Sequence, residues 1–408
     1  MKGFIALLFI FVSLFPSEVS ALPIQFADSV EVSLLTCEPG DAVYAKFGHT
    51  ALRIRDAAGR DMSYNYGIFD FRTEHFYLKF LRGHTDYLLG VYPTEYFLEE
   101  YRQRESMVWE QVLNLSTAEK QQLIELLNVN YQPENRMYRY NFVFDNCATR
   151  PKVMVQNALD GMISYSSAYS TETYRQLINL YISDDAWLHL GINLIFGAAA
   201  EQEAGPGGAS FLPLLLRNDL QRAVVVGPPT EADSRKLVSH SQLVVGPFSK
   251  EVKTTAWWLH PLFLFLIIVV WGSILTFRKR TSKLLSNCFD SALFSVTALA
   301  GMLIFTLSFF SEHPLVESNW NLLWLNPLNL LPAVLIWYRG ADKLLLVYYT
   351  VNLLLILIAV VVIAFQVQVI PVAAIPVLIV VLIRTSRRFD DLLKRYYKPG
   401  TTGWKWKR

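Results

Sequence analysis

The chain has 408 residues, 52% of them hydrophobic, and a formal net charge of only +2. This length allows one sizeable soluble domain together with a second unit. The sequence contains neither a strongly basic stretch nor a nucleic-acid-binding motif, which argues against a nucleic-acid partner.

The N-terminus has the features of a secretory signal peptide. Lys2 supplies the positive charge, residues 4–15 form a short apolar core, and the small residues at 19–21 resemble a cleavage site. We expect residues 1–21 to be removed, with an extracytoplasmic domain over residues 22–256. A signal anchor that is not cleaved is the alternative.

The extracytoplasmic domain is expected to mix strands with helices. Alternating apolar residues predict strands over 30–35, 50–55 and 62–66, and the last two form a hairpin that starts at His49. A helix is expected over 116–128, where Ser116 and Glu119 can form a capping box.

Three later segments complete this domain. A helical pattern runs from Cys147 to about Leu159. The apolar stretch 191–197 is too short to span a membrane, so we expect it to be buried or to touch the bilayer surface. The small and glycine-rich stretch 198–210 predicts a mobile loop.

The composition changes after Trp257, where a bundle of about five membrane helices is predicted over 257–384. Lys and Arg follow the first, third and fifth apolar stretches, whereas the loops 311–319 and 366–368 contain neither. The positive-inside rule therefore places the first domain outside the cytoplasm and the basic tail, 385–408, inside it. The apolar stretches are 257–277, 292–310, 320–338, 344–365 and 369–383.

Cys147 and His49 are the candidate nucleophile and base. A helix N-terminus and an adjacent imidazole both favour the reactive thiolate, and Cys147 stands where a helix is expected to begin. Papain-like thiol enzymes use this placement, in which the backbone N–H of the cysteine points at a developing oxyanion. Asn65, on the strand paired with that of His49, is the best candidate to orient the imidazole; Tyr64 and Ser63 are weaker ones.

Two features complicate this assignment. A disulfide between Cys37 and Cys147 would remove the nucleophile; otherwise we expect Cys37 to be structural, because no histidine-bearing strand adjoins it. Pro151 lacks a helical donor, so the helix begins either at Cys147 or near Thr149. The seven histidines show no metal-ligand spacing, so neither a metal nor a cofactor is expected.

Separated motifs in chain order resemble the Lnb-type family. The segments 36–40, 44–54, 64–71 and 141–150 are similar to its N-terminal periplasmic domain. The polar positions in 313–328 resemble its membrane part and include His313, Asn319, Asn321 and Asn326.

The resemblance implies both a fold and a function. The family is thought to N-acylate bacterial lipoproteins, and its α+β soluble domain looks like a circularly permuted papain-like domain followed by an all-α transmembrane bundle. The lecithin:retinol acyltransferase group has the same His-then-Cys order and also moves acyl chains from phospholipids. The implied enzyme lies in the bacterial inner membrane with its catalytic domain in the periplasm. It takes an acyl group from a phospholipid donor, forms a thioester on Cys147 and acylates an apolipoprotein acceptor.

The outer polar positions are candidate substrate contacts. His313, Asn319, Asn321 and Asn326 could bind a head group or the acceptor amine, because polar groups within membrane bundles are functional by default; an ordinary polar loop is the alternative. The competing functions are a membrane-anchored papain-like thiol hydrolase or peptidase acting on cell-envelope substrates, and a non-enzymatic assembly or sensor protein. A peptidase needs one anchor rather than five spans, which favours the acyltransferase.

Overall fold

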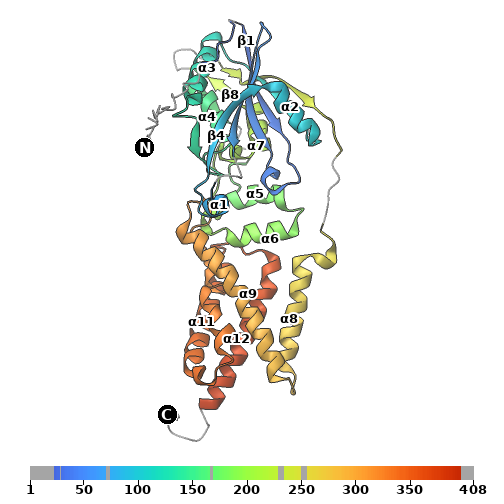
Figure 1. Cartoon of the computed structure of the whole chain (residues 1–408), viewed down its shortest axis with the longest axis vertical. Helices are drawn as coiled ribbons and strands as arrows, with labels where there is room; N and C mark the ends of the chain where they lie inside the picture. Colours follow the sequence, from blue (N-terminus) through green and yellow to red (C-terminus); the bar gives the residue numbers. More distant parts are fainter. Residues whose placement is uncertain are drawn as a thin grey trace, which may run out of the picture.

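The computed structural model describes residues 23–27, 29–69, 74–165, 169–227, 234–249 and 255–396. The predicted signal peptide therefore lies outside the described residues. A sheet-rich N-terminal domain and a helical C-terminal bundle follow one another along the longest axis (Figure 1). Two short helices, α5 (Tyr174–Ile182) and α6 (Ala186–Ile195), lie between them.

The N-terminal domain is built on a seven-stranded antiparallel sheet with the strand order β10-β5-β1-β2-β3-β4-β6. The three predicted strands are confirmed as β1, β2 and β3, and β2 begins at His49. The strands are β1 (Val30–Cys37), β2 (His49–Asp56), β3 (Asp61–Ile68), β4 (Asp86–Pro93), β5 (Val108–Leu113), β6 (Met137–Arg139) and β10 (Val238–Val245), while β7 (Met162–Ser164), β8 (Val224–Val226) and β9 (Ser234–Lys236) form a smaller sheet.

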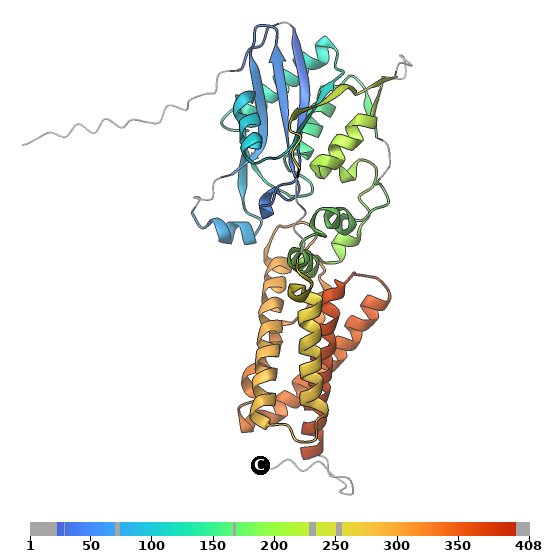
Figure 2. The same ribbon diagram turned by 90° about the vertical axis from the view of Figure 1, so that its right-hand side faces the viewer.

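Helices cover both faces of the large sheet because its strands carry apolar side chains on both faces (Figure 2). On one face, Leu52 and Ile54 belong to a core shared with α3 (Thr117–Tyr131), α4 (Thr149–Ala158) and α7 (Pro213–Arg222). On the other face, Leu35 and Ala51 pack with Phe97 and Leu98 of α2 (Thr94–Gln103).

The predicted capping box is confirmed at the start of α3. The Glu119 N–H donates to Ser116 Oγ over 3.2 Å, and the Ser116 N–H donates to Glu119 Oε2 over 2.7 Å. The stretch 198–210 differs from the mobile loop that we expected. Its ends form the 3₁₀ helices η2 (Ala198–Glu201) and η3 (Gly208–Phe211), whose small residues are buried in a core with α5, since they allow close packing.

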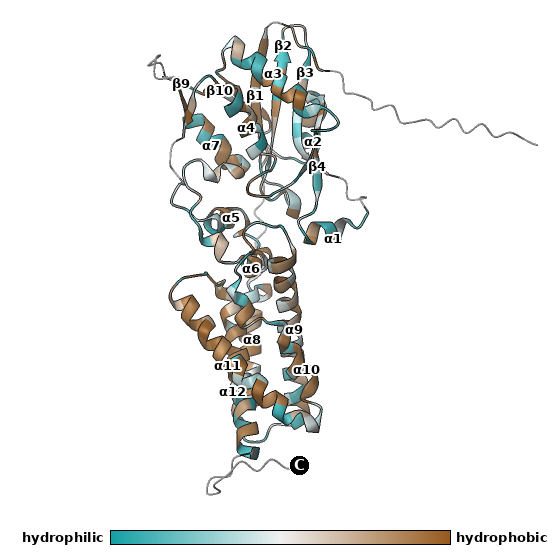
Figure 3. Cartoon of the chain, turned by 90° about the vertical axis from the view of Figure 1, so that its left-hand side faces the viewer, coloured by the Kyte–Doolittle hydropathy of each residue, from teal (hydrophilic) through white to brown (hydrophobic). Residues whose placement is uncertain are grey.

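The C-terminal bundle is hydrophobic on its outside (Figure 3). By length and composition, α9 (Lys283–Phe310) and α11 (Asp342–Ala364) can cross a membrane, whereas the apolar α8 (Pro261–Phe277) is shorter. The third predicted span is not one helix but η5 (Trp320–Leu323), η6 (Pro327–Asn329) and α10 (Leu330–Leu335), because prolines interrupt the hydrogen-bond ladder. The count of five spans stays a prediction.

The last helix, α12 (Ile375–Tyr396), continues past the predicted end of the bundle at 384. Arg384 and Asp290 are both buried, and two guanidinium nitrogens of Arg384 donate to the carboxylate over 2.6 and 2.9 Å. Arg388 donates to the same carboxylate over 2.5 Å. These ion pairs hold α12 against α9, so the basic residues that we assigned to a tail partly belong to the bundle.

Candidate active site

The site lies where β1 ends and β2 begins, at the end of the sheet nearest to α5 (Figure 1). The ring of Phe47, directly before β2, lies 5.9 Å from that of Tyr181 in α5, and Lys46 forms an ion pair with Asp184. The helices α5 and α6 therefore separate this end of the sheet from the bundle.

The β2–β3 pairing brings Asn65 to His49. Leu52 pairs with Tyr64, so strand alternation puts Asn65 on the same face as His49. The Nε2 atom of His49 lies 2.6 Å from Oδ1 of Asn65. Tyr64 points into the hydrophobic core and Ser63 bonds to Thr94, so neither of the weaker candidates contacts the ring.

Cys147 meets the opposite side of the imidazole. Its thiol and the His49 ring are hydrogen-bonded. Because Nε2 faces Asn65, Nδ1 is the ring nitrogen left for the sulfur. Gly67 lies beside both residues: a Cβ there would be in ordinary contact with Cβ of Cys147 at 3.5 Å and with Cε1 of His49 at 3.7 Å, so its φ of +95°, and not a lack of space, favours glycine.

The electrostatics of the site favour a charged imidazole. Burial by itself would lower the pKa of His49. The negative charge of the Cys147 thiolate, its hydrogen bond to the ring and the hydrogen bond with Asn65 together outweigh burial and raise the pKa of His49 above its usual value. The arrangement therefore favours the protonated form of His49.

The residue before the cysteine builds the start of α4. Oδ1 of Asn146 accepts hydrogen bonds from the Ala148 and Thr149 N–H groups over 2.8 and 2.9 Å, as a helix cap does. Its Nδ2 donates to the carbonyl of Phe142 over 2.7 Å. The side chain of Asn146 thus joins the loop to the helix and fixes the backbone on both sides of Cys147.

The backbone of Cys147 is held from the sheet as well. The Thr50 hydroxyl donates to the Cys147 carbonyl. Within the described part of the chain, no acceptor is found for the Cys147 N–H, which remains able to bind a developing oxyanion. The α-helix itself starts at Thr149, so Pro151 falls in the first turn, where an N–H is not needed.

Asp145 and Arg150 brace the same turn. Nε and Nη2 of Arg150 donate to the two carboxylate oxygens of Asp145 over 2.6 and 2.7 Å. The guanidinium also lies over the ring of Tyr138, 3.5 Å from its centroid. The Asp-Asn-Cys segment is thus fixed by a planar, bidentate ion pair that lysine could not reproduce.

Cys37 requires a correction. It lies directly opposite His49 in the β1–β2 pair, so the expectation that no histidine-bearing strand adjoins it is wrong. Both Cys37 and Cys147 are free thiols, and the alternative of a disulfide is not realised. Cys37 is fully buried, and this burial raises the pKa of its thiol, which keeps it neutral and poorly nucleophilic.

Tyr92 is a site residue that the sequence analysis missed. Its hydroxyl accepts a hydrogen bond from Nδ2 of Asn65 over 2.6 Å, which fixes the amide with its oxygen toward His49. Tyr92 comes from β4, a strand that was not predicted. The pairing of Asn65 with Gly90 brings β4 alongside, and no local sequence signal indicates this contact.

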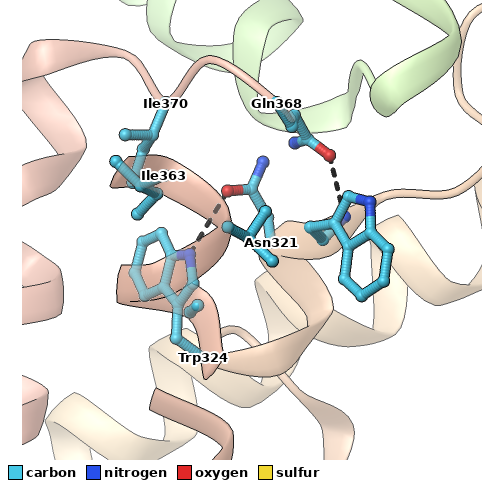
Figure 4. Close-up of a pocket in the computed structure, with 8 residues that line it drawn as sticks. Asn321, Trp324, Ile363, Gln368 and Ile370 are labelled. Atoms are coloured by element: carbon cyan, nitrogen blue, oxygen red, sulfur yellow. Dashed lines mark hydrogen bonds between the residues drawn. The ribbon is translucent and has the colours of Figure 1, made fainter. Parts of the chain in front are cut away.

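The predicted substrate-binding residues lie elsewhere. Nδ2 of Asn319 donates to the carbonyls of Leu194 and Ile195 at the end of α6, over 2.9 Å each. Nδ2 of Asn321 donates to the Leu194 carbonyl over 3.0 Å. Asn321 also lines a small pocket with Gln368, where its Oδ1 accepts a hydrogen bond from the indole of Trp324 (Figure 4).

The other two predicted residues are likewise engaged. Nε2 of His313 lies 2.6 Å from the carbonyl of Phe80 in the N-terminal domain. Asn326 is buried inside the bundle, where its Nδ2 lies 3.4 Å from Oδ1 of Asn352. The structure therefore does not gather these four residues around Cys147. Three of them connect the bundle to earlier parts of the chain, because their polar groups contact the backbone carbonyls of Phe80 and of α6.

Comparison with known protein families identifies both parts of the chain. Residues 25–180 match the model of the Lnb N-terminal periplasmic domain, and residues 253–394 match that of the Lnb transmembrane domain. The two matches cover most of the chain and include the site as well as the outer polar residues. Comparison with curated proteins and with solved structures gave no match. The chain therefore belongs to the Lnb family and is a membrane protein with a periplasmic N-terminal domain.

Proposed function

We propose that this protein N-acylates the diacylglyceryl-cysteine of bacterial lipoproteins with an acyl group taken from a phospholipid. Membership of the Lnb family suggests a membrane enzyme that processes lipoproteins. The observation that carries the finer proposal is the imidazole of His49, which has the thiol of Cys147 on one side and the amide of Asn65 on the other.

The first half-reaction forms a thioester. The Cys147 thiolate attacks the carbonyl carbon of a phospholipid ester, and the resulting oxyanion accepts a hydrogen bond from the Cys147 N–H. When the C–O bond breaks, the imidazolium of His49 gives its proton to the leaving alkoxide. The products are a lysophospholipid and an acyl group on the sulfur. The raised pKa of His49 supports this role, because the ring must begin the step protonated.

The second half-reaction uses the ring as a base. The free α-amine of the lipoprotein's cysteine attacks the thioester carbonyl, and the now neutral imidazole removes a proton from the nitrogen. The C–S bond then breaks, which releases the amide and restores the thiolate–imidazolium pair. A thioester suits this transfer because amines attack it more readily than an oxygen ester.

The arrangement also supports a papain-like ancestry. A thiol at the start of α4 faces a histidine on an antiparallel sheet, and an asparagine orients the imidazole. The histidine precedes the cysteine in the chain, as circular permutation of such a domain would produce. With the catalytic domain in the periplasm, the bundle 257–384 would hold the enzyme where both lipid substrates reside, and the C-terminus would be cytoplasmic.

The thioester provides the test. Full-length protein in nanodiscs of phosphatidylethanolamine, without acceptor, should gain an acyl mass on the peptide that contains Cys147, and neutral hydroxylamine should remove it. Cys288→Ser, which removes an exposed thiol on α9, should still acylate, whereas Cys147→Ser should not. Acyl transfer that persists in Cys147→Ser would refute the mechanism. Release of free fatty acid in place of amide, with acceptor present, would favour the thiol hydrolase.

A further inference from the structure

The short helix α1 (Phe76–Leu81) exposes large apolar side chains beside the bundle. Tyr77, Leu78 and Phe80 are 83%, 57% and 51% exposed, an unusual concentration for a helix that faces water. The charged residues next to them, Lys79 and Arg82, are also exposed. Apolar and aromatic side chains interspersed with basic ones are typical of segments that lie in a membrane interface.

Hydrogen bonds fix the height of α1 relative to the bundle. The Arg82 carbonyl accepts a hydrogen bond from the Glu312 N–H over 2.9 Å, and the Phe80 carbonyl lies 2.6 Å from Nε2 of His313. Both partners directly follow α9, which ends at Phe310. In addition, Nε2 of His84 lies 3.1 Å from Oε1 of Glu312. Therefore α1 lies at the level at which α9 leaves the membrane.

The composition of α9 shows where the hydrocarbon region ends. Its 28 residues span about 42 Å, more than the roughly 30 Å of a hydrocarbon core. The part of α9 that exceeds the hydrocarbon core is its inner end, where buried Asn287 and Asp290 bind arginines. At the outer end, Phe309 and Phe310 are 64% and 61% exposed, as lipid-facing residues are. The outer hydrocarbon boundary therefore lies close to the residues that hold α1.

A second aromatic cluster marks this boundary elsewhere on the molecule. Trp257 and Trp258, in the 3₁₀ helix η4 (Trp257–Leu259) before α8, are 71% and 53% exposed. The indole N–H of Trp187 in α6 donates to the Leu259 carbonyl over 2.9 Å. Tryptophans gather where the acyl region of a bilayer meets its head groups. The helix α1 and this cluster thus lie at the junction between the N-terminal domain and the bundle (Figure 1).

We propose that α1 inserts into the outer leaflet and leads the acyl chain of the donor phospholipid toward Cys147. The helix lies in the connection between β3, which carries Gly67 beside the thiol, and its neighbour β4 in the sheet. The helices α5 and α6 lie between the sheet and the bundle, and α1 lies beside them at the edge of this junction (Figure 1). The insertion of α1 stands by itself; its task as donor guide rests on the proposed function.

Photocrosslinking tests the insertion without any reference to activity. The full chain is reconstituted in nanodiscs of phosphatidylethanolamine that carries a diazirine at the end of one acyl chain, irradiated and analysed by mass spectrometry. Peptides that contain Tyr77 and Phe80 should be labelled. Tyr96 on α2 is a matched control, since it is 70% exposed and lies on a helix away from the bundle. Labelling of the Tyr96 peptide but not of α1, or of neither, would overturn the insertion.

A donor comparison tests the second part. In the variant Tyr77→Ser/Phe80→Ser, acylation of Cys147 from bilayer phospholipid, relative to acylation from a water-soluble short-chain phospholipid, should fall about tenfold. Tyr96→Ser should leave this ratio unchanged. An equal loss with both donors would refute α1 as a donor guide and indicate damage to the site. Wild-type protein that is crosslinked through α1 but accepts an acyl group from neither donor would refute the proposed function while the insertion stands.

Discussion

Asn65 and Asn319 are both buried asparagines whose side-chain oxygen and nitrogen are hydrogen-bonded, yet they serve different parts of the molecule. Asn65 lies between His49 and the hydroxyl of Tyr92, so its hydrogen bonds orient a titratable ring. Asn319 donates to two backbone carbonyls of α6, and its oxygen accepts from Gln368 and from the Asn321 N–H. The difference teaches that a polar residue is a candidate for chemistry when its partner can change charge, and a candidate for assembly when none of its partners titrates.

The largest effect should come from the two residues that exchange the proton. Cys147→Ser and His49→Ala should each lower acyl transfer by roughly a thousandfold or more, and the double variant should lose no more than the worse single variant, because the pair acts as one unit. Steady-state rates with a synthetic diacylglyceryl peptide measure this. Additive losses would mean that the imidazole acts independently of the thiol.

Asn65→Ala should cost less, about ten- to a hundredfold in rate, because the ring remains but is no longer oriented. The pH profile distinguishes this loss from general damage. The folded pKa of His49 is raised, so the charged ring contributes stability fully below its unfolded pKa of about 6.5 and loses it as the pH rises through the folded value. Thioester formation also needs the protonated ring as the acid, so its rate should fall as the pH rises through the same value.

The removal of Asn65 takes away one hydrogen bond that raises the pKa of His49, so this alkaline limb should move to lower pH in Asn65→Ala. A matched control is Asn321→Ala, which removes a buried amide at the domain junction and should leave the limb in place. If the alkaline limb of the pH profile does not move in Asn65→Ala, the limb reports the titration of a group other than His49.

Asn319→Ala should act on stability rather than on the chemical step. The Leu194 carbonyl keeps its donor Asn321, but the Ile195 carbonyl loses the hydrogen bond from Asn319, at a cost of about 1–3 kcal/mol. Thermal unfolding in detergent should show a lower midpoint, while thioester formation per folded molecule stays close to that of the wild type. A normal midpoint together with a slow second half-reaction would instead restore the prediction that this residue serves the acceptor.

The smallest effect is expected for Tyr92→Phe. It removes the hydroxyl that accepts from Asn65 but keeps the ring, so the rate should fall by about two- to fivefold, within the energy of one neutral hydrogen bond. The double variant Tyr92→Phe/Asn65→Ala should be no slower than Asn65→Ala alone, since both changes act through the same amide. A Tyr92→Phe loss as large as that of His49→Ala would mean that the hydroxyl contacts the substrate itself.

The sequence by itself determined the local features. Short-range periodicity indicates that β2 begins at His49 and that α9 and α11 are long and apolar enough to span a membrane. A single capping side chain, Ser116, marks the start of α3. The pairing of Asn65 with His49 also follows from local pattern, because a hairpin with a short turn fixes its register and strand alternation then sets the facing side chains.

Only the tertiary structure decided which distant groups meet. Tyr92 reaches Asn65 through a β3–β4 pairing that encloses α1, and Cys37 lies opposite His49 because β1 and β2 are neighbours in the sheet. The polar residues after α9 contact carbonyls of α6, more than a hundred positions earlier in the chain. Every residue has a backbone carbonyl, so the sequence does not indicate which carbonyl a side chain will contact. An asparagine that binds a substrate and one that connects two domains therefore look alike in the sequence.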